Sequence, residues 1–157
     1  SAILGKGKIM SKLEKTFVSS TNWTERVGPT AALATLEKYE NCDVSQKLIY
    51  LGDKIKKIWE NIFNEFNIKI SIQGLPSLPS FNILSKDKLL LTMLIDQMLN
   101  KNILSFNQFR PSYAHSEYHL NTYKKNLKNS IQFVLENEKN LKRKTLKAFN
   151  SFERLTK

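Results

Sequence analysis

The sequence predicts an α/β fold, in which helices and short strands share one chain of 157 residues. Two apolar stripes at helical spacing support this fold class, one over residues 44–66 and one over residues 120–134. Between them, Ile68, Ile70 and Ile72 alternate with polar residues, as a half-buried strand does. The chain is 41% hydrophobic and contains nine Phe, five Tyr and two Trp, which excludes a disordered protein.

The first part of the chain, up to about residue 41, has few elements that could form a core of their own. In order, they are a strand end over 1–5, a short helix over 8–13, an extended segment over 16–21 and a helix from Gly28 to about Asn41. Gly28 suits a helix cap and Pro29 suits the first helical position, so this pair marks a helix start. A strand end needs a sheet to join, so we expect this part to depend on structure outside it.

From residue 42 onward, the pattern predicts a small α/β layer structure. Asp43 and Gln46 resemble a capping box at the start of the long amphipathic helix over 43–66. The later elements are predicted as a strand over 68–73, a turn over 74–79, a strand over 81–84, a helix over 86–100, a strand over 103–106, a loop over 107–115, a helix from 116 and a last helix over 138–152.

The formal net charge of +11 raises the question of an acidic partner. Residues 121–157 carry ten Lys or Arg and three Asp or Glu, which suits a face for nucleic acid or an anionic membrane. The basic residues are almost all Lys, however, and Arg is the side chain that binds phosphate in a bidentate way. We therefore expect a solvated basic face, no nucleic acid and no membrane partner.

Metal, disulfide and membrane functions have little support in the sequence. The chain contains a single cysteine, Cys42, so it has no internal disulfide framework. His115 and His119 are four residues apart but have no third ligand at metal spacing. No apolar run approaches the roughly 18 residues of a membrane span, and we expect a cytoplasmic protein.

Three segments resemble one enzyme family in the same order along the chain. Residues 17–36 read FVSSTNWTERVGPTAALATL, residues 91–104 form a helix and strand pattern, and residues 113–117 read YAHSE. The first closely resembles the segment that follows the cofactor lysine in class III pyridoxal-phosphate-dependent aminotransferases, and its STxWTER variant is typical of members similar to glutamate-1-semialdehyde aminomutase. The chain thus looks like the C-terminal part of such an enzyme.

The resemblance implies a fold-type-I transferase with pyridoxal 5'-phosphate (PLP) as cofactor. Residues 1–41 would be the end of the large cofactor-binding domain, and residues 42–157 would be the small α/β domain. The enzyme would transfer an amino group through a lysine Schiff base that lies upstream of Ser1. By this resemblance the chain alone contains no catalytic residue and is inactive, and the parent is a cytoplasmic homodimer with cofactor sites shared between subunits.

The resemblance also assigns possible binding residues. Thr24 falls where the family places a threonine on the phosphate of the partner subunit's PLP, and Ser20 and Thr21 are weaker neighbours. A hydroxyl just before a helix start is suited to an anion. Arg110 is a possible clamp for a substrate carboxylate, and His115 is expected to be structural rather than catalytic.

Two other readings remain open at this point. The chain could be a relative that keeps the dimer surface but has lost the cofactor, or a basic helical module that binds nucleic acid or membrane. The substrate is equally open, because aminotransferases and aminomutases of this kind act on amino acids, amino-aldehydes and other amines.

Overall fold

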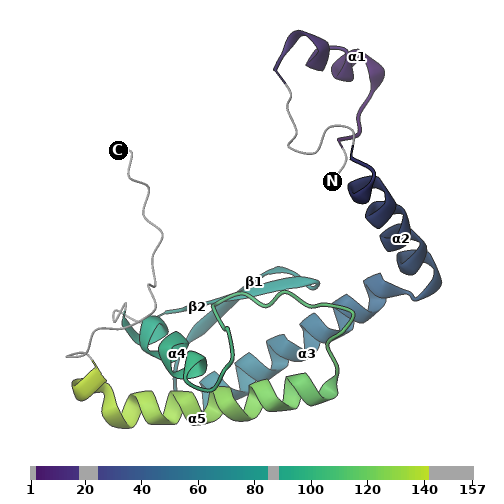
Figure 1. Cartoon of the computed structure of the whole chain (residues 1–157). Coiled ribbons are helices and arrows are strands. Elements are labelled where there is room, and N and C mark those ends of the chain that lie inside the picture. Colours follow the sequence, from purple (N-terminus) through teal and green to yellow (C-terminus); the bar gives the residue numbers. More distant parts are fainter. Residues whose placement is uncertain (1–2, 18–24, 85–88, 142–157) are drawn as a thin grey trace. The chain divides into compact units, whose positions relative to one another are not determined.

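The computed structural model describes residues 3–17, 25–84 and 89–141 (Figure 1). The chain divides into two compact units, Ser1–Val44 and Ser45–Lys157. The first unit contains α1 (Gly7–Met10), a 3₁₀ turn η1 (Leu13–Lys15) and α2 (Val27–Asn41). The long helix α3 (Val44–Glu65) begins at the boundary, and the second unit continues with β1 (Ile70–Leu75), β2 (Leu78–Ile83), α4 (Leu89–Leu99) and α5 (Glu117–Leu141).

The first unit buries very little of its apolar surface. None of the residues in α1, η1 or α2 is buried, and Leu36 on α2 stays 60% exposed. The predicted helix start is confirmed, because Gly28 and Pro29 lie in the first turn of α2. Residues 3–5 form no strand, and most of the extended segment predicted over 16–21 lies outside the described residues.

The core of the second unit lies where α3, the hairpin, α4 and α5 meet. Its buried members come from all four parts: Leu51, Ile55, Trp59, Ile62, Phe63, Phe81, Leu94, Met98, Leu120, Leu127 and Ile131. Phe81 of β2 packs edge-on against Trp59, with ring centroids 4.8 Å apart, and against Phe63 at 5.1 Å. Aromatic pairs in this arrangement contribute about 0.5–1.5 kcal/mol beyond the area they bury.

The two strands form an antiparallel hairpin in which Ile70 pairs with Ile83 and Leu75 with Leu78. We expected a turn over 74–79, but the strands extend into this region, and Pro79 lies within β2. The ladder tolerates this proline because the backbone polar groups of alternate β2 residues, Pro79 among them, point away from β1. Pro79 therefore needs no N–H to pair with β1, and its carbonyl instead accepts a hydrogen bond of 2.9 Å from the backbone N–H of Phe109. Gly74 provides the left-handed conformation that the hairpin end requires, with φ +89°.

The third strand predicted over 103–106 is wrong. Those residues have no regular secondary structure, and the pairing with β2 occurs further along, at a single bridge between Ser80 and Gln108. The apolar pattern of this segment reflects packing instead, because Ile103 lies against the core and Leu104 is 92% exposed.

Three helix predictions also need correction or lie partly outside the described chain. The Asp43–Gln46 capping box does not form, because Asp43 adopts a left-handed conformation (φ +45°) rather than the extended one of an N-cap. The predicted break between the two C-terminal helices near residue 138 is absent, because α5 continues as a single helix from Glu117 to Leu141. The predicted first residues of the 86–100 helix, and all residues after 141, lie outside the described ranges.

Candidate functional site: an aromatic pocket at the start of α5

The structure describes one of the four predicted site residues. Arg110 is exposed, and its Nε donates a hydrogen bond of 3.1 Å to the side-chain oxygen of Gln108. The predicted phosphate-binding residues Thr24, Thr21 and Ser20 all lie outside the described residues. The geometry therefore centres on the second unit, around the segment that contains Gln108.

A pocket of about 310 Å³ lies between the segment 102–109 and the start of α5. This size is at the lower end of the range for small-molecule sites. Ring side chains from both sides line it, and these are Phe106, Phe109, His115, Tyr118, His119 and Tyr123. Among the described residues that line the pocket there is neither a carboxylate nor a Lys or Arg side chain.

The two histidines of the pocket are held in the same way, one turn apart. The backbone N–H of Ser112 donates to Nδ1 of His115 at 2.9 Å, and the backbone N–H of Ser116 donates to Nδ1 of His119 at 3.1 Å. Because each Nδ1 accepts from a backbone N–H, the neutral ring carries its proton on Nε2. Burial lowers the pKa of His115, and the neighbouring His119 lowers it further, so His115 favours this neutral form.

A chain of hydrogen bonds links buried Trp59 to two residues of the pocket lining, Tyr123 and Ser105. The indole N–H of Trp59 donates to the hydroxyl oxygen of Tyr123 at 2.9 Å, and this hydroxyl also bonds to Ser105. Trp59 is only 1% exposed, so its N–H has no access to water in place of this partner. Burial raises the pKa of Tyr123, which therefore stays a neutral phenol. These hydrogen bonds join α3, the 102–109 segment and α5 at one point.

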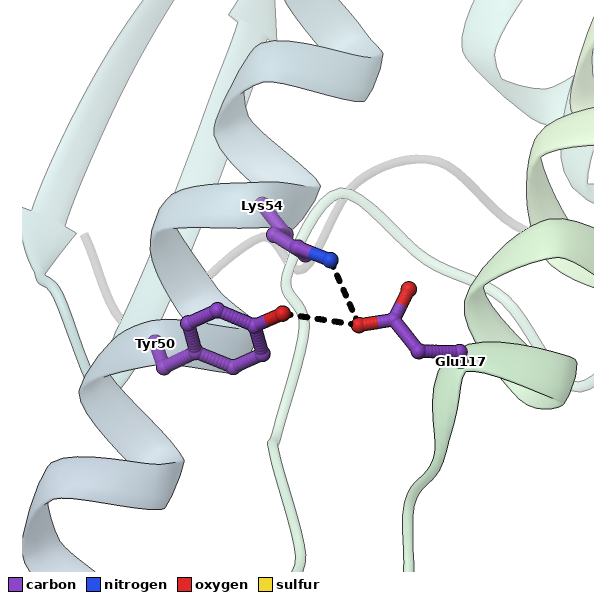
Figure 2. A network of polar contacts seen from close by, with 3 residues as sticks. All are labelled: Tyr50, Lys54 and Glu117. Atoms are coloured by element: carbon purple, nitrogen blue, oxygen red, sulfur yellow. Dashed lines mark hydrogen bonds and ion pairs between the residues drawn. The ribbon is translucent and has the colours of Figure 1, made fainter.

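A second group of polar contacts fixes the loop that carries His115. Figure 2 shows Tyr50 and Lys54 of α3 converging on Glu117, the first residue of α5. The Lys54 ammonium lies 2.5 Å from the carboxylate, and these contacts lower the pKa of Glu117 and raise that of Lys54. Lys47 donates to the carbonyl of Tyr113 at 2.7 Å and lies 4.2 Å from the centre of its ring. We call these three α3 residues, Lys47, Tyr50 and Lys54, the α3 clasp.

Sequence reasoning missed the pocket itself. It predicted a structural role for His115, considered His119 only as a metal ligand, included Tyr123 only in the apolar stripe over residues 120–134, and assigned no role to Gln108. The spacing Ser116-x-x-His119 is a usable signal, since a side-chain acceptor three residues after an N-cap Ser forms the capping-box bond seen here. No local signal marks Tyr123, because its partner Trp59 lies 64 residues away in the chain.

The described pocket does not fit PLP by itself. PLP enzymes hold this cofactor through a lysine, and none lines the pocket. The described residues also contain no group of three His, Cys, Asp or Glu side chains that could hold a metal ion. Within the same described ranges, every helix is too short or too polar to cross a membrane.

Comparison with known proteins gives one match, and it is structural. No protein-family model and no curated protein matches the sequence. The fold is similar to a solved structure, the PLP internal aldimine form of the Sphingopyxis sp. MTA144 FumI protein, with a TM-score of 0.76 and 16% sequence identity. The match covers 87% of this chain and 34% of that one, so this chain spans about a third of the length of FumI. The α/β fold class is confirmed, and it is the fold of part of a protein that binds PLP.

Proposed function

We propose that this chain is the C-terminal part of a class III PLP-dependent aminotransferase or of an aminomutase similar to glutamate-1-semialdehyde aminomutase. The observation that carries the proposal is the structural likeness to FumI at a TM-score of 0.76, together with the resemblance of residues 17–36 to the segment after the cofactor lysine. Bound PLP supplies the electron sink that allows an amino group to move between substrates. The lysine that holds it would lie upstream of Ser1.

The first unit fits a role as the edge of a larger cofactor-binding domain. Its helix α2 has no buried residue, and Leu33 and Leu36 remain more than half exposed. Apolar side chains at helical spacing normally face a core, so the exposed face of α2 supports a partner domain or subunit. We infer a cytoplasmic homodimer in which Thr24, with Thr21 and Ser20 as weaker contacts, binds the phosphate of the partner subunit's PLP.

The second unit would act as the small domain beside the substrate. Arg110 is the cation proposed to bind a substrate carboxylate, since its guanidinium is exposed and keeps donors beyond the one used on Gln108. The substrate class that follows is a small amino acid or amino-aldehyde acid.

The test is borohydride reduction of the intact protein that carries this sequence, isolated from its source, followed by peptide mapping. We expect one pyridoxyl-lysine in a peptide of the same polypeptide that precedes Ser1, and none on the lysines of residues 1–157. An intact protein without any adduct would refute a PLP enzyme and leave the non-catalytic relative or the basic binding module as explanations.

A variant pair tests the phosphate contact separately. Thr24→Ala should weaken PLP retention about tenfold, because a hydroxyl bond to a charged phosphate is lost. Thr30→Ala is the matched control, since Thr30 is an exposed residue in the first turns of α2. Equal retention in the two variants would contradict the role of Thr24.

A further inference from the structure

The pocket at the start of α5 holds more hydrogen-bond donors than acceptors. In both His115 and His119, Nδ1 accepts a backbone N–H, so Nε2 is the ring nitrogen that is left to donate. The described residues give neither Nε2 a partner. His119 is exposed and His115 is half-buried, so these two N–H donors of the pocket are accessible to an acceptor that enters from solvent.

Gln108 adds a third donor, and its orientation is fixed by a neighbour. Arg110 donates to the side-chain oxygen of Gln108 at 3.1 Å, so this oxygen is occupied as an acceptor. The amide NH₂ of Gln108 is left to donate, and Gln108 lines the pocket. Because the guanidinium of Arg110 is bonded to the same side-chain amide, it places a positive charge next to the Gln108 donor.

The electrostatics around the pocket favour an anion. No Asp or Glu is found among the described lining residues. Glu117, the acidic residue at the start of α5, is already paired with Lys54 and Tyr50. The 157 residues of this chain carry a formal charge of +11, which raises the local concentration of small anions.

The rest of the wall is aromatic and sets the shape of the ligand. Phe106, Phe109, Tyr118 and Tyr123 line the pocket of about 310 Å³, which is open to solvent on the side of Tyr118 (73% exposed) and Phe106 (48% exposed). We propose that this pocket binds a small aromatic carboxylate, with the ring between the aromatic walls and the carboxylate on the N–H donors of Gln108, His115 and His119. Every residue that lines the pocket lies in the second unit, and the binding test below does not depend on the lysine adduct that tests the proposed function.

The test measures benzoate binding to the intact protein by titration calorimetry, with benzamide as the neutral probe of the same shape. Benzoate should bind at least about tenfold more tightly, since only its charged oxygens accept from several donors at once. Gln108→Glu keeps the size of the side chain and its bond to Arg110 but replaces the donor with a negative charge. It should weaken benzoate binding more than about tenfold.

Two more variants separate this site from general charge effects. Asn121→Asp adds the same charge to α5 at an exposed position outside the pocket lining, and it should leave benzoate affinity nearly unchanged. His119→Gln retains an acceptor for the helix cap and should reduce affinity without loss of fold. In the unmodified protein, benzoate should shift the Nε2 nitrogen resonances of His115 and His119.

The proposal is overturned by any of three results: no binding at about 10 mM benzoate, equal affinity for benzamide, or equal loss in Gln108→Glu and Asn121→Asp. Unmoved histidine resonances in the presence of bound benzoate would also overturn it, by placing the ligand elsewhere. Because the pyridoxyl adduct is measured independently, its absence would refute the proposed function and leave this pocket proposal standing, and the reverse also holds.

Discussion

Removal of the Tyr123 hydroxyl should destabilise the second unit far more than removal of the Tyr50 hydroxyl. In Tyr123→Phe, the indole N–H of Trp59 loses its acceptor at 2.9 Å while Trp59 is only 1% exposed, and Ser105 loses a partner as well. A buried donor without a partner costs about 1–3 kcal/mol. In Tyr50→Phe, the lost bond to Glu117 is at the surface, with Tyr50 51% exposed, and water takes its place. We expect less than about 0.5 kcal/mol there.

The assay is urea unfolding followed by Trp59 fluorescence, in a Trp23→Phe background that removes the second indole. The two variants delete the same atom from the same residue type, so they differ only in burial and in the partners left behind. Tyr123→Phe should lower the unfolding midpoint, and Tyr50→Phe should leave it near that of the parent. Equal midpoints in the two variants would refute the reasoning that an unpaired buried N–H, and not the loss of a hydroxyl as such, determines the cost.

Three further predictions use other features of the second unit. Gly52→Ala should cost about 3 kcal/mol or more in urea unfolding, because a Cβ there would lie 1.6 Å from the carbonyl oxygen of Pro76; an unchanged midpoint would contradict this contact. Ser130→Ala should stabilise the fold by about 1 kcal/mol in the same assay, since the buried Oγ has no partner among the described residues; a lower midpoint would reveal one. His115 has a folded pKa below the ordinary 6.5, so the unfolded chain takes up the proton first, and stability should fall as pH drops through about 6.5 and level off below the folded pKa. His115→Gln should remove this part of the pH dependence measured by thermal unfolding, and an identical pH profile would contradict it.

Local patterns in the sequence predicted the positions of α2 and α3 well. The Gly28–Pro29 start of α2 and the long apolar stripe of α3 depend on spacing within a few residues, and both are in the structure. The Ile68–Ile72 alternation likewise predicted a strand, although β1 begins two residues later, at Ile70. These predictions succeeded because each depends only on the repeat of a single helix or strand and on the one face that it buries.

The third strand and the pocket depended on information that no local pattern contains. The apolar residues of the 103–106 segment suit a strand, but its pairing depends on which part of the β2 edge is within reach, and this edge pairs with Gln108 instead. Tyr123 and Trp59 are brought together by the packing of α3 against α5, across 64 residues of chain. The role of Asp43 was predicted wrongly because Asp is favoured both at N-caps and in left-handed turns, and only the path of the backbone decides between them.

The α3 clasp has a consequence for the order in which this unit folds. Its bonds join residues that are 63 to 67 positions apart in the chain, so each requires the closure of a long loop before it can form. The hairpin, by contrast, closes over two residues, and we expect it to form early. The segment that carries His115 is therefore expected to become ordered among the last parts of this unit, and to be the first to open when the unit is stressed. Substitutions in the first half of α3, remote in sequence from the aromatic pocket, would then change the fraction of molecules in which that pocket is formed.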